Sequence, residues 1–504
     1  MLSGLKNFAI EKVVNAAAGA SANMSDEGIL RLIGILRTLM PAQWYAHALD
    51  MGEKYVKEKH PAVEAVRRIA RNLSPHVRKM IIRNAVIGLF IEGNKVRKKF
   101  YDEEGFASPP MIMMSPTSVC NYRCYGCYAD GEDWKAELPP ELIHRLIDEA
   151  STIGSRLIAF TGGEPFLRKD LVDIMEKHPE VMFSIYTNGS RITPEMLDKF
   201  AKWGNVHLNF SVEGPQEYTD DRRGAGAWSV VMHQMAECRK RGLYFGFAAT
   251  ISRKTLEATM SDEFIRTMID AGAGHGWYIN LMPTGPVESQ ELMLTAAQRY
   301  WMRERAAVIR KTHPIFLVDF VNESWLVGGC MAGGRKFIHI NSNGDVEPCM
   351  FIHYAVDNIR NKTIREVLKS DFMKKMREAV PHDARDARPC MIIDHPHKLR
   401  EIVEGAGVYK TTPDAGQMVH EWAPYLDSYG AEFGRLDAKH AENATDSELV
   451  GIRAEMPRPE IAVGVEVGKR YGPRQEDHGA KQGACGTGCA STPVVTSAPD
   501  SPAV

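Results

Sequence analysis

Apolar residues recur at helical spacing through the first hundred positions of the chain. Over residues 26–40 they fall at intervals of three and four, and a proline follows at once. A second helix is predicted over residues 44–59, and a third begins after Ser74, with Pro75 in the first helical position. We therefore expect residues 1–105 to form a helical N-terminal region.

The pattern changes at Met111 to short apolar runs separated by helical stretches. The predicted strands are 111–117, 157–161, 182–187, 206–212, 244–251 and 277–282. The predicted helices are 140–153, 171–177, 194–203, 228–241 and 262–271, whereas the glycine-rich residues 271–276 are predicted to form a loop. This alternation predicts an α/β fold with a parallel sheet, either open or a partial barrel, whose ligands gather at the carboxyl ends of the strands.

Composition narrows the class of protein. The chain has 504 residues, of which 44% are hydrophobic and 25% charged, so a folded core is expected. A net charge of −2 argues against a dedicated nucleic-acid binder. No apolar run is long enough to span a membrane, and no signal peptide is predicted before Glu11. Nine cysteines, three of them within eight residues, favour a reducing, cytoplasmic compartment and metal ligation.

Three cysteines follow the first predicted strand directly. Cys120, Cys124 and Cys127 are spaced by four and three residues, and such a triplet can hold one face of a cubane iron–sulfur cluster from a single loop. The fourth iron would then have no protein ligand. A structural zinc site is the alternative, but zinc prefers four ligands and no fourth cysteine or histidine is close in the sequence. We predict an iron–sulfur site at these three cysteines.

This cysteine loop resembles that of the radical S-adenosylmethionine (radical SAM) enzymes, and further motifs match the family in order. Each comes at the end of a predicted strand. They are Thr-Gly-Gly-Glu-Pro at 161–165, Tyr-Thr-Asn-Gly at 186–189, Ser-Val-Glu-Gly-Pro at 211–215 and Tyr-Ile-Asn-Leu-Met-Pro at 278–283. The resemblance implies a partial (β/α)6 barrel of the TIM type.

The resemblance also implies which residues bind SAM. Its methionine amino group would be engaged by Gly162, Gly163, Glu164 and Pro165, and a further cofactor segment includes Asn188. Near its ribose and carboxylate would lie Ser211 and Glu213, and near its adenine Met282. The chain departs from the family at Gly126, before the last cysteine, where an aromatic residue is frequent. The acidic and basic run 220–223 is predicted to be either an anion clamp or a salt-bridged loop.

The chemistry implied by the resemblance is that of two cofactors. A reduced [4Fe-4S] cluster binds SAM and cleaves it to methionine and a 5′-deoxyadenosyl radical, which abstracts hydrogen from an unactivated C–H bond. A low-potential electron donor such as ferredoxin or flavodoxin is implied as a partner. The residues that act on the substrate itself are unknown from the sequence.

A second set of cysteines lies in the C-terminal third. Cys330 and Cys349 flank a predicted hairpin that turns at 341–345, and Cys390 follows. The spacing resembles the opening half of a SPASM module, reduced or twitch-like, which implies an auxiliary iron–sulfur cluster held by these three cysteines. Its fourth iron would be open or bound by Asp394 or His395. Three buried structural cysteines are the alternative.

These patterns predict five regions. They are the basic helical region 1–105, the radical SAM core 106–325, the auxiliary-cluster module 326–405, a helical extension 406–460 and a disordered tail 461–504. The tail carries Cys485 and Cys489, which we take to be incidental, and Cys238 is predicted to be a packed thiol.

Two enzymatic functions remain open, and a non-enzymatic iron–sulfur or zinc scaffold is disfavoured by the ordered SAM motifs. The first is coupling of lipid acyl chains. Through Ser-Pro-Thr-Ser at 115–118 and Cys-Met-Ile-Ile-Asp-His-Pro at 390–396, the chain resembles bacterial radical SAM proteins of membrane-spanning lipid synthesis. Residues 53–100 hold 13 Lys and Arg against four Glu, and the apolar third helix resembles an amphipathic element on a membrane surface. The alternative to that surface role is a set of helices packed on the barrel. The second function is modification of a peptide or protein by a radical SAM–SPASM maturase.

Overall fold

The computed structural model describes residues 22–39, 42–133, 135–284, 289–322, 329–380, 388–405 and 407–443. The predicted tail, with Cys485 and Cys489, and the end of the predicted extension after residue 443 lie outside the described residues.

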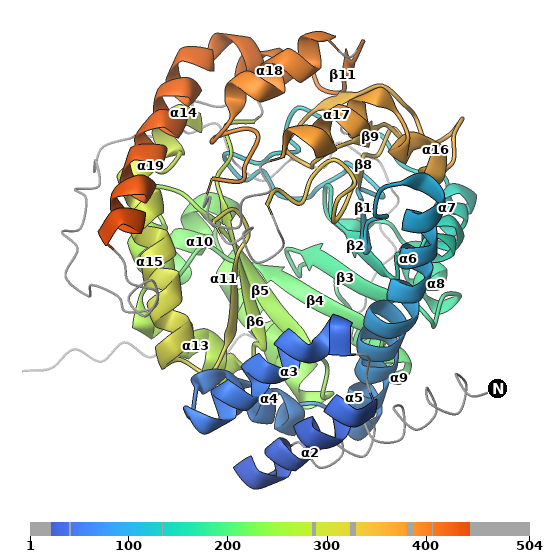
Figure 1. Cartoon of the computed structure of the whole chain (residues 1–504), viewed down its shortest axis with the longest axis vertical. Coiled ribbons are helices and arrows are strands. Elements are labelled where there is room, and N and C mark those ends of the chain that lie inside the picture. Colours follow the sequence, from blue (N-terminus) through green and yellow to red (C-terminus); the bar gives the residue numbers. More distant parts are fainter. Residues whose placement is uncertain are drawn as a thin grey trace, which may run out of the picture. The chain divides into compact units, whose positions relative to one another are not determined.

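A mostly parallel sheet forms the centre of the fold (Figure 1). Its strands are β1 (Met111–Met114), β2 (Leu157–Phe160), β3 (Met182–Thr187), β4 (Val206–Ser211), β5 (Phe245–Ile251), β6 (His275–Asn280), β7 (Phe316–Asp319), β8 (His339–Ile340) and β9 (Val346–Glu347). They lie in the order β7-β6-β5-β4-β3-β2-β1-β8-β9, and every pair is parallel except β8 with β9. The α/β class and the partial barrel are confirmed.

Helices connect the strands, and local sequence signals mark where they begin and end. They are α7 (Pro140–Thr152), α8 (Leu171–Glu176), α9 (Pro194–Trp203), α10 (Gln216–Arg223), α11 (Ala227–Lys240), α12 (Leu256–Thr259), α13 (Asp262–Ala271), α14 (Ser289–Leu292) and α15 (Ala296–Thr312), with a short 3-10 turn, η2 (Pro165–Leu167). In α9, Thr193 caps the first turn by accepting a hydrogen bond from the Met196 amide, and Gly204 ends the helix in the left-handed conformation.

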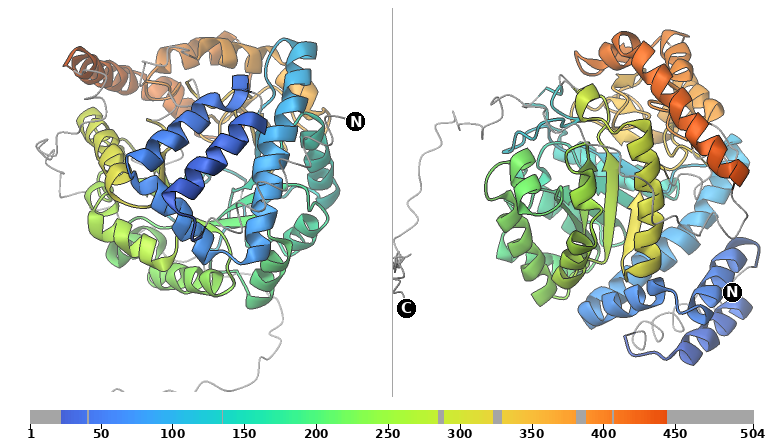
Figure 2. Two further views of the ribbon diagram at one scale, coloured as in Figure 1. Left: turned by 60° about the horizontal axis from the view of Figure 1, so that its bottom comes forward. Right: turned by 90° about the vertical axis from the view of Figure 1, so that its left-hand side faces the viewer.

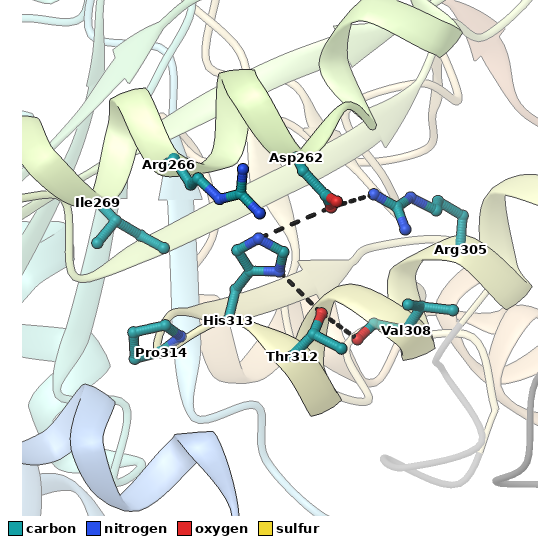
Figure 3. Close-up of a pocket in the computed structure, with 8 residues that line it drawn as sticks. All are labelled: Asp262, Arg266, Ile269, Arg305, Val308, Thr312, His313 and Pro314. Carbon is teal, nitrogen blue, oxygen red and sulfur yellow. Dashed lines mark hydrogen bonds and ion pairs between the residues drawn. The ribbon is translucent and has the colours of Figure 1, made fainter.

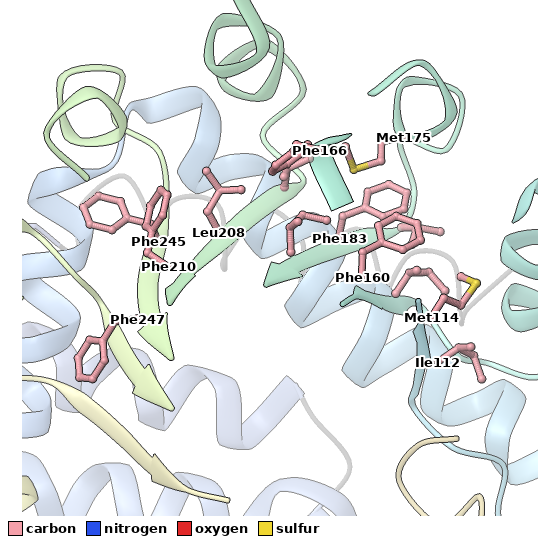
Figure 4. Packing of buried hydrophobic residues seen from close by; sticks show 14 of the residues in the cluster. Ile112, Met114, Phe160, Phe166, Met175, Phe183, Leu208, Phe210, Phe245 and Phe247 are labelled. Carbon is pink, nitrogen blue, oxygen red and sulfur yellow. The ribbon is translucent and has the colours of Figure 1, made fainter. Parts of the chain in front are cut away.

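Alternate residues of β1 face two different hydrophobic clusters. In β1, Ile112 and Met114 belong to the large cluster between the sheet and its helices, whereas Met113 belongs to the cluster shared with the C-terminal region. Figure 4 shows the large cluster, in which the Phe160 and Phe183 rings stack with centroids 5.9 Å apart. This period of two decides which face of the sheet each side chain points to, whereas the parallel pairing of the strands brings their carboxyl ends to one side.

The N-terminal helices lie across the other end of the barrel (Figure 2). They are α2 (Asp26–Leu39), α3 (Ala42–Lys57), α4 (Pro61–Asn72), α5 (Pro75–Ile81), the π-helix η1 (Ile82–Glu92) and α6 (Gly93–Glu104). Their polar side chains bind carbonyls of the loops that precede the strands. Arg68 donates to Ala273 and Pro314, Asn84 donates to Pro179, and Arg97 donates to Gly154.

This arrangement corrects the interpretation of the third helix as a surface-lying amphipathic element. Its apolar side chains are either buried, as are Val77, Ile87, Leu89 and Ile91, or half-buried, and only Phe90 among them is exposed, at 53%. The helix is apolar because it packs on the barrel. No helix within the described residues has the length and hydrophobicity needed to cross a membrane.

The C-terminal region adds to the same sheet. Strand β8 pairs in parallel with β1, and β8 and β9 form the predicted hairpin, with His339 opposite Glu347. The remaining elements are β10 (Tyr354–Ala355), α16 (Ile364–Leu368), α17 (Asp371–Ala379), α18 (Pro396–Gly405), β11 (Tyr409–Lys410), the π-helix η4 (Gln417–Glu421) and α19 (Ala423–Asn443). The hairpin between Cys330 and Cys349 is therefore continuous with the barrel.

Candidate active site

The cysteine triplet lies in a loop that leaves the carboxyl end of β1. Cys120, Cys124 and Cys127 are each only partly exposed. Burial raises the pKa of the Cys120 thiol to about 12 and that of Cys127 to about 11, and the neighbouring Cys124 adds to both shifts. Three half-buried thiols that repel one another as thiolates fit a site completed by a cationic metal cluster, which offsets their charge.

The Gly-Gly-Glu-Pro loop contacts the backbone of the cysteine loop directly. The Gly163 amide donates to the Thr117 carbonyl at 2.9 Å, and the Glu164 amide donates to the Val119 carbonyl at 2.8 Å. A Cβ at Gly163 would lie 2.0 Å from the Val119 oxygen, so no side chain fits there. The two glycines are therefore required by the close approach of two loops.

The carboxylate of Glu164 joins this loop to the one after β3. Its side chain is 1% exposed and accepts hydrogen bonds from the Phe166 amide (3.1 Å), the Thr187 hydroxyl (2.8 Å) and the Asn188 amide (2.8 Å). Burial raises its pKa to about 6, although these three donors oppose the shift. Glu164 thus has a structural role whatever it contributes to SAM.

The Asn188 side chain is tied back to the cysteine loop. Its amide nitrogen donates to Asn121 Oδ1 at 3.1 Å, and Asn121 in turn donates to the Ser190 hydroxyl at 2.9 Å. Three successive strand ends, those of β1, β2 and β3, therefore meet at the cysteine loop, as the parallel topology predicts.

At the end of β4, Glu213 is fully buried between two arginines. Its carboxylate pairs with Arg222 at 2.8 Å and with Arg223 at 2.5 Å. Burial alone would raise the pKa of Glu213, but the two guanidinium groups outweigh it and lower the pKa. Arg222 also donates to the Tyr125 and Gly126 carbonyls, and Arg223 lies 3.8 Å from Cys124 Sγ. The arginines of run 220–223 are salt-bridged to Glu213, as one of the two interpretations held, but the run forms the end of helix α10 and not a loop.

The departure at Gly126 has a steric cause. Gly126 has a φ of +63°, and a Cβ there would meet Leu281 Cδ1 at 2.8 Å. Leu281 follows β6 and packs with Tyr125 and Leu292. An apolar side chain from the neighbouring loop thus occupies the space that an aromatic residue at position 126 would need.

The second set of cysteines converges on one cavity. Cys330, Cys349 and Cys390 line it together with apolar side chains, among them Met282, Phe320 and Phe351. Burial raises the pKa of Cys349 well above its usual value and that of Cys390 to about 12, with Cys330 adding to both shifts. Three mutually repelling thiols in an apolar cavity fit an auxiliary iron–sulfur cluster. Met282 lies at this cavity, whereas the sequence predicted it near the adenine of SAM.

Neither of the two residues considered for the fourth iron lines this cavity. Asp394 is fully buried, pairs with Arg299 at 2.5 and 3.0 Å, and accepts a hydrogen bond from the Cys390 amide at 2.9 Å. His395 Nε2 bonds the Arg388 carbonyl at 2.7 Å. Asp394 and Arg299 therefore position Cys390 through its backbone. Sequence reasoning missed Arg299, since no local motif marks it.

A buried polar network joins the two cysteine regions. Ser115 Oγ lies 2.8 Å from His339 Nε2, and the other ring nitrogen of His339 lies 2.7 Å from Glu347, which His353 approaches at 3.4 Å. Burial alone would raise the pKa of Glu347, but His353 and His339 outweigh it and bring the pKa to about 2. Sequence reasoning missed this network, and the predicted hairpin, in which the structure places His339 opposite Glu347, was the only signal for it.

Other features lie apart from these sites. Cys238 is fully buried in the large core cluster, which confirms a packed thiol. A pocket of about 470 Å³ lies between α13 and α15 (Figure 3), where Asp262 pairs with Arg305 and approaches His313 at 3.7 Å. Among the described residues, no group of three His, Cys, Asp or Glu side chains is placed to hold a single metal ion. A cubane cluster differs from a single ion because each cysteine binds a different iron.

Comparisons with known proteins assign both regions. The model of the radical SAM superfamily matches residues 114–258, and that of SPASM, an iron–sulfur cluster-binding domain, matches residues 330–391. An AdoMet-dependent heme synthase of Methanosarcina barkeri is 26% identical over 54% of this chain and 85% of its own length. A PqqA peptide cyclase of Ruegeria pomeroyi is 28% identical over 46% of this chain and 65% of its own length.

A solved structure of Streptococcus suis SuiB bound to S-adenosylmethionine superposes with a TM-score of 0.48 at 14% identity, covering 67% of this chain and 79% of that one. The relatives named here give no support to the predicted resemblance to lipid synthases.

Fold, cysteine loops and family matches together define an enzyme that works with iron–sulfur clusters and SAM. The chain is a radical SAM enzyme, and it carries a SPASM domain after its radical SAM domain. Its cofactors are a [4Fe-4S] cluster and SAM, with a further iron–sulfur cluster in the SPASM domain.

Proposed function

We propose that this enzyme abstracts hydrogen from an unactivated C–H bond of a substrate, with Cys120, Cys124 and Cys127 holding the cluster that binds SAM. When bound, the cluster and SAM supply the radical that takes the hydrogen atom. The observation that carries the proposal is the meeting of three strand-end loops at the cysteine triplet, through the amides of Gly163 and Glu164.

The chain's own residues supply rigidity and charge at this site. Glu164 holds two loops together, and Arg223 places a cation 3.8 Å from Cys124 Sγ. A guanidinium beside a thiolate favours the deprotonated form that binds iron. We propose that Gly162, Gly163, Pro165, Asn188 and Ser211 complete the SAM site, all at the same ends of the strands.

We further propose that Cys330, Cys349 and Cys390 hold one auxiliary cluster. Their shared cavity supports this, as does the Arg299–Asp394 pair that fixes the Cys390 backbone. Apolar side chains around the three sulfurs exclude water, and so protect a cluster and any radical formed near it.

Iron content and SAM cleavage test both assignments. Anaerobically reconstituted wild type should cleave SAM to 5′-deoxyadenosine under strong reductant. The Cys120→Ala, Cys124→Ala and Cys127→Ala variants should each lose that activity. Cys330→Ala with Cys349→Ala should lose the auxiliary cluster, about half of the iron if both clusters are cubanes.

Cys238→Ala is the matched control, because it removes a buried cysteine on α11 and should keep all the iron. Retained cleavage in a triplet variant, or unchanged iron in the auxiliary variant, would contradict the corresponding assignment.

For the substrate, we propose a tetrapyrrole or a peptide, because the relatives that align with the chain are named as heme synthases and peptide cyclases. The acyl-chain alternative has only the apolar lining of the auxiliary cavity in its favour. To decide among these three substrate classes, tetrapyrrole, peptide and lipid fractions of the native cell are added separately to the reconstituted enzyme. The true substrate should raise 5′-deoxyadenosine above the uncoupled yield, and a response to lipid alone would refute our choice.

A further inference from the structure

A cleft of about 790 Å³ lies where the end of α6 meets the loop before β8 and helices α16 and α17. It is far from neutral. Its charged lining consists of two carboxylates, Glu104 and Glu378, and five cations, which are Arg335, Lys336, Lys369, Lys374 and Arg377. The volume falls in the range of small-molecule sites, roughly 300–1,000 Å³.

The cations outnumber the carboxylates available to them. Glu104 already pairs with Lys369 at 2.7 Å and with Arg365 at 2.8 Å. The side chains of Lys336 and Lys374 have no hydrogen-bond or ion-pair partner among the residues that the structure describes. Glu378 also lines the cleft but makes no ion pair with Lys374, four positions earlier on the same helix.

Three of these cations, Arg335, Lys336 and Arg377, are half-buried, whereas Lys369 and Lys374 are exposed. Arg377 stacks on the Phe106 ring, 4.0 Å from its centroid, and donates to the Gly333 carbonyl. Burial lowers the pKa of Arg377 to about 10 and also lowers that of Lys336, to which the nearby Arg335 adds. Partly desolvated like charges destabilise the fold unless a counter-charge offsets them.

The cleft is separate from the SAM site. The Lys336 carbonyl accepts a hydrogen bond from the Met111 amide, which places Lys336 at the amino end of β1, whereas the SAM motifs lie at the carboxyl ends. On its inner side, Arg335 donates to the Cys330 carbonyl, so the loop that lines the cleft also carries an auxiliary cysteine.

We propose that this cleft binds a phosphate-bearing ligand, with Lys336, Lys374 and Arg377 as its contacts. A phosphate group carries nearly two negative charges and accepts several charge-assisted hydrogen bonds, so it would offset the cations that the protein leaves unpaired. The ligand is a soluble phosphate ester or the headgroup of an anionic phospholipid, since both present the same chemistry.

Binding to the reconstituted holoenzyme tests the proposal. Glycerol 1-phosphate is titrated by calorimetry, and co-sedimentation is measured with vesicles of phosphatidylglycerol and of phosphatidylcholine. The Lys336→Gln/Lys374→Gln double variant should weaken binding at least about 10-fold, because two charge-assisted contacts are lost. Lys375→Gln is the matched control, since Lys375 lies on the same helix but donates to the Gly405 carbonyl.

The proposal is supported if the wild type binds glycerol 1-phosphate, or binds phosphatidylglycerol vesicles but not phosphatidylcholine vesicles. In either case the double variant must lose this binding and the control variant must keep it. The probe that binds identifies the source of the phosphate. Absence of binding to all three probes overturns it. Equal binding by the wild type and a double variant with an unchanged melting temperature overturns it as well.

Discussion

A methyl group at position 163 should separate the two loops on which the SAM-cluster site depends. In Gly163→Ala, the Cβ would lie 2.0 Å from the Val119 oxygen and 2.4 Å from its carbonyl carbon. The φ of Gly163 is outside the left-handed region, so an alanine there would meet a steric clash but no backbone strain. Relief requires the backbones to move apart by about 1 Å or more, well beyond what close-packed loops tolerate.

That movement breaks two hydrogen bonds, from the Gly163 amide to Thr117 (2.9 Å) and from the Glu164 amide to Val119 (2.8 Å). Each buried amide left without a partner costs about 1–3 kcal/mol, so the loss is about 2–6 kcal/mol. Native proteins are stable by only about 5–15 kcal/mol, and the strain falls next to Cys120.

We expect Gly163→Ala to lose the iron of the cysteine triplet and SAM cleavage together, while the auxiliary iron remains. Iron and sulfide quantitation, 5′-deoxyadenosine yield and a thermal melt measure this. Gly131→Ala is the control, because its nearest contact, Thr412 Cβ, would be at an ordinary 3.4 Å. Full iron and wild-type cleavage in Gly163→Ala would refute the close approach of the loops.

Three further outcomes follow from buried charges. Arg299→Met should destabilise the fold by about 3–5 kcal/mol in denaturant unfolding, because it leaves Asp394 unpaired. The double variant Arg299→Met/Asp394→Leu should recover much of that loss. Equal destabilisation of the single and the double variant would refute the pairing. Burial lowers the pKa of His207 to about 4 and that of His275 to about 3. As the pH falls, the unfolded chain therefore binds protons before the folded protein does. The free energy of unfolding should fall from pH 6.5 towards 4 by up to about 1.4 kcal/mol per pH unit for each histidine. A flat profile would contradict this, and His207→Gln should reduce the slope. Arg223→Met should lower the midpoint potential of the SAM cluster in an EPR-monitored titration, because a cation beside Cys124 is lost; an unchanged potential would show that it is too far to matter.

Much of the barrel was predictable because its strands and helices carry local signals. The predicted bounds of β3, α9 and α13 coincide with the structure. The predicted loop at residues 271–276 is confirmed over 272–274 and wrong at its end, because β6 begins at His275. A Cβ at Gly276 would meet the Phe247 ring at 2.3 Å, so this glycine makes room for a neighbouring aromatic ring within the sheet.

The site was predictable where the motifs are contiguous and not where partners are distant in sequence. The cysteine triplet could be named from its spacing, and the Gly-Gly-Glu-Pro loop from its resemblance to a motif of the radical SAM enzymes. Arg299 and Asp394 lie 95 positions apart, and no local pattern pairs them. Likewise, the hairpin of β8 and β9 was expected, but its parallel pairing with β1 depends on a long-range contact that periodicity does not encode.

The pairing of β8 with β1 bears on how this protein tolerates truncation. The amides of Met113 and Ser115 donate to the carbonyls of Ile338 and Ile340, at 3.0 and 2.9 Å. A chain cut between the two iron–sulfur regions would leave these groups of β1 as an open sheet edge, a template for pairing with other chains and for aggregation. We therefore expect the radical SAM domain to aggregate when it is expressed alone, because its edge strand is covered by residues more than 220 positions further along the chain.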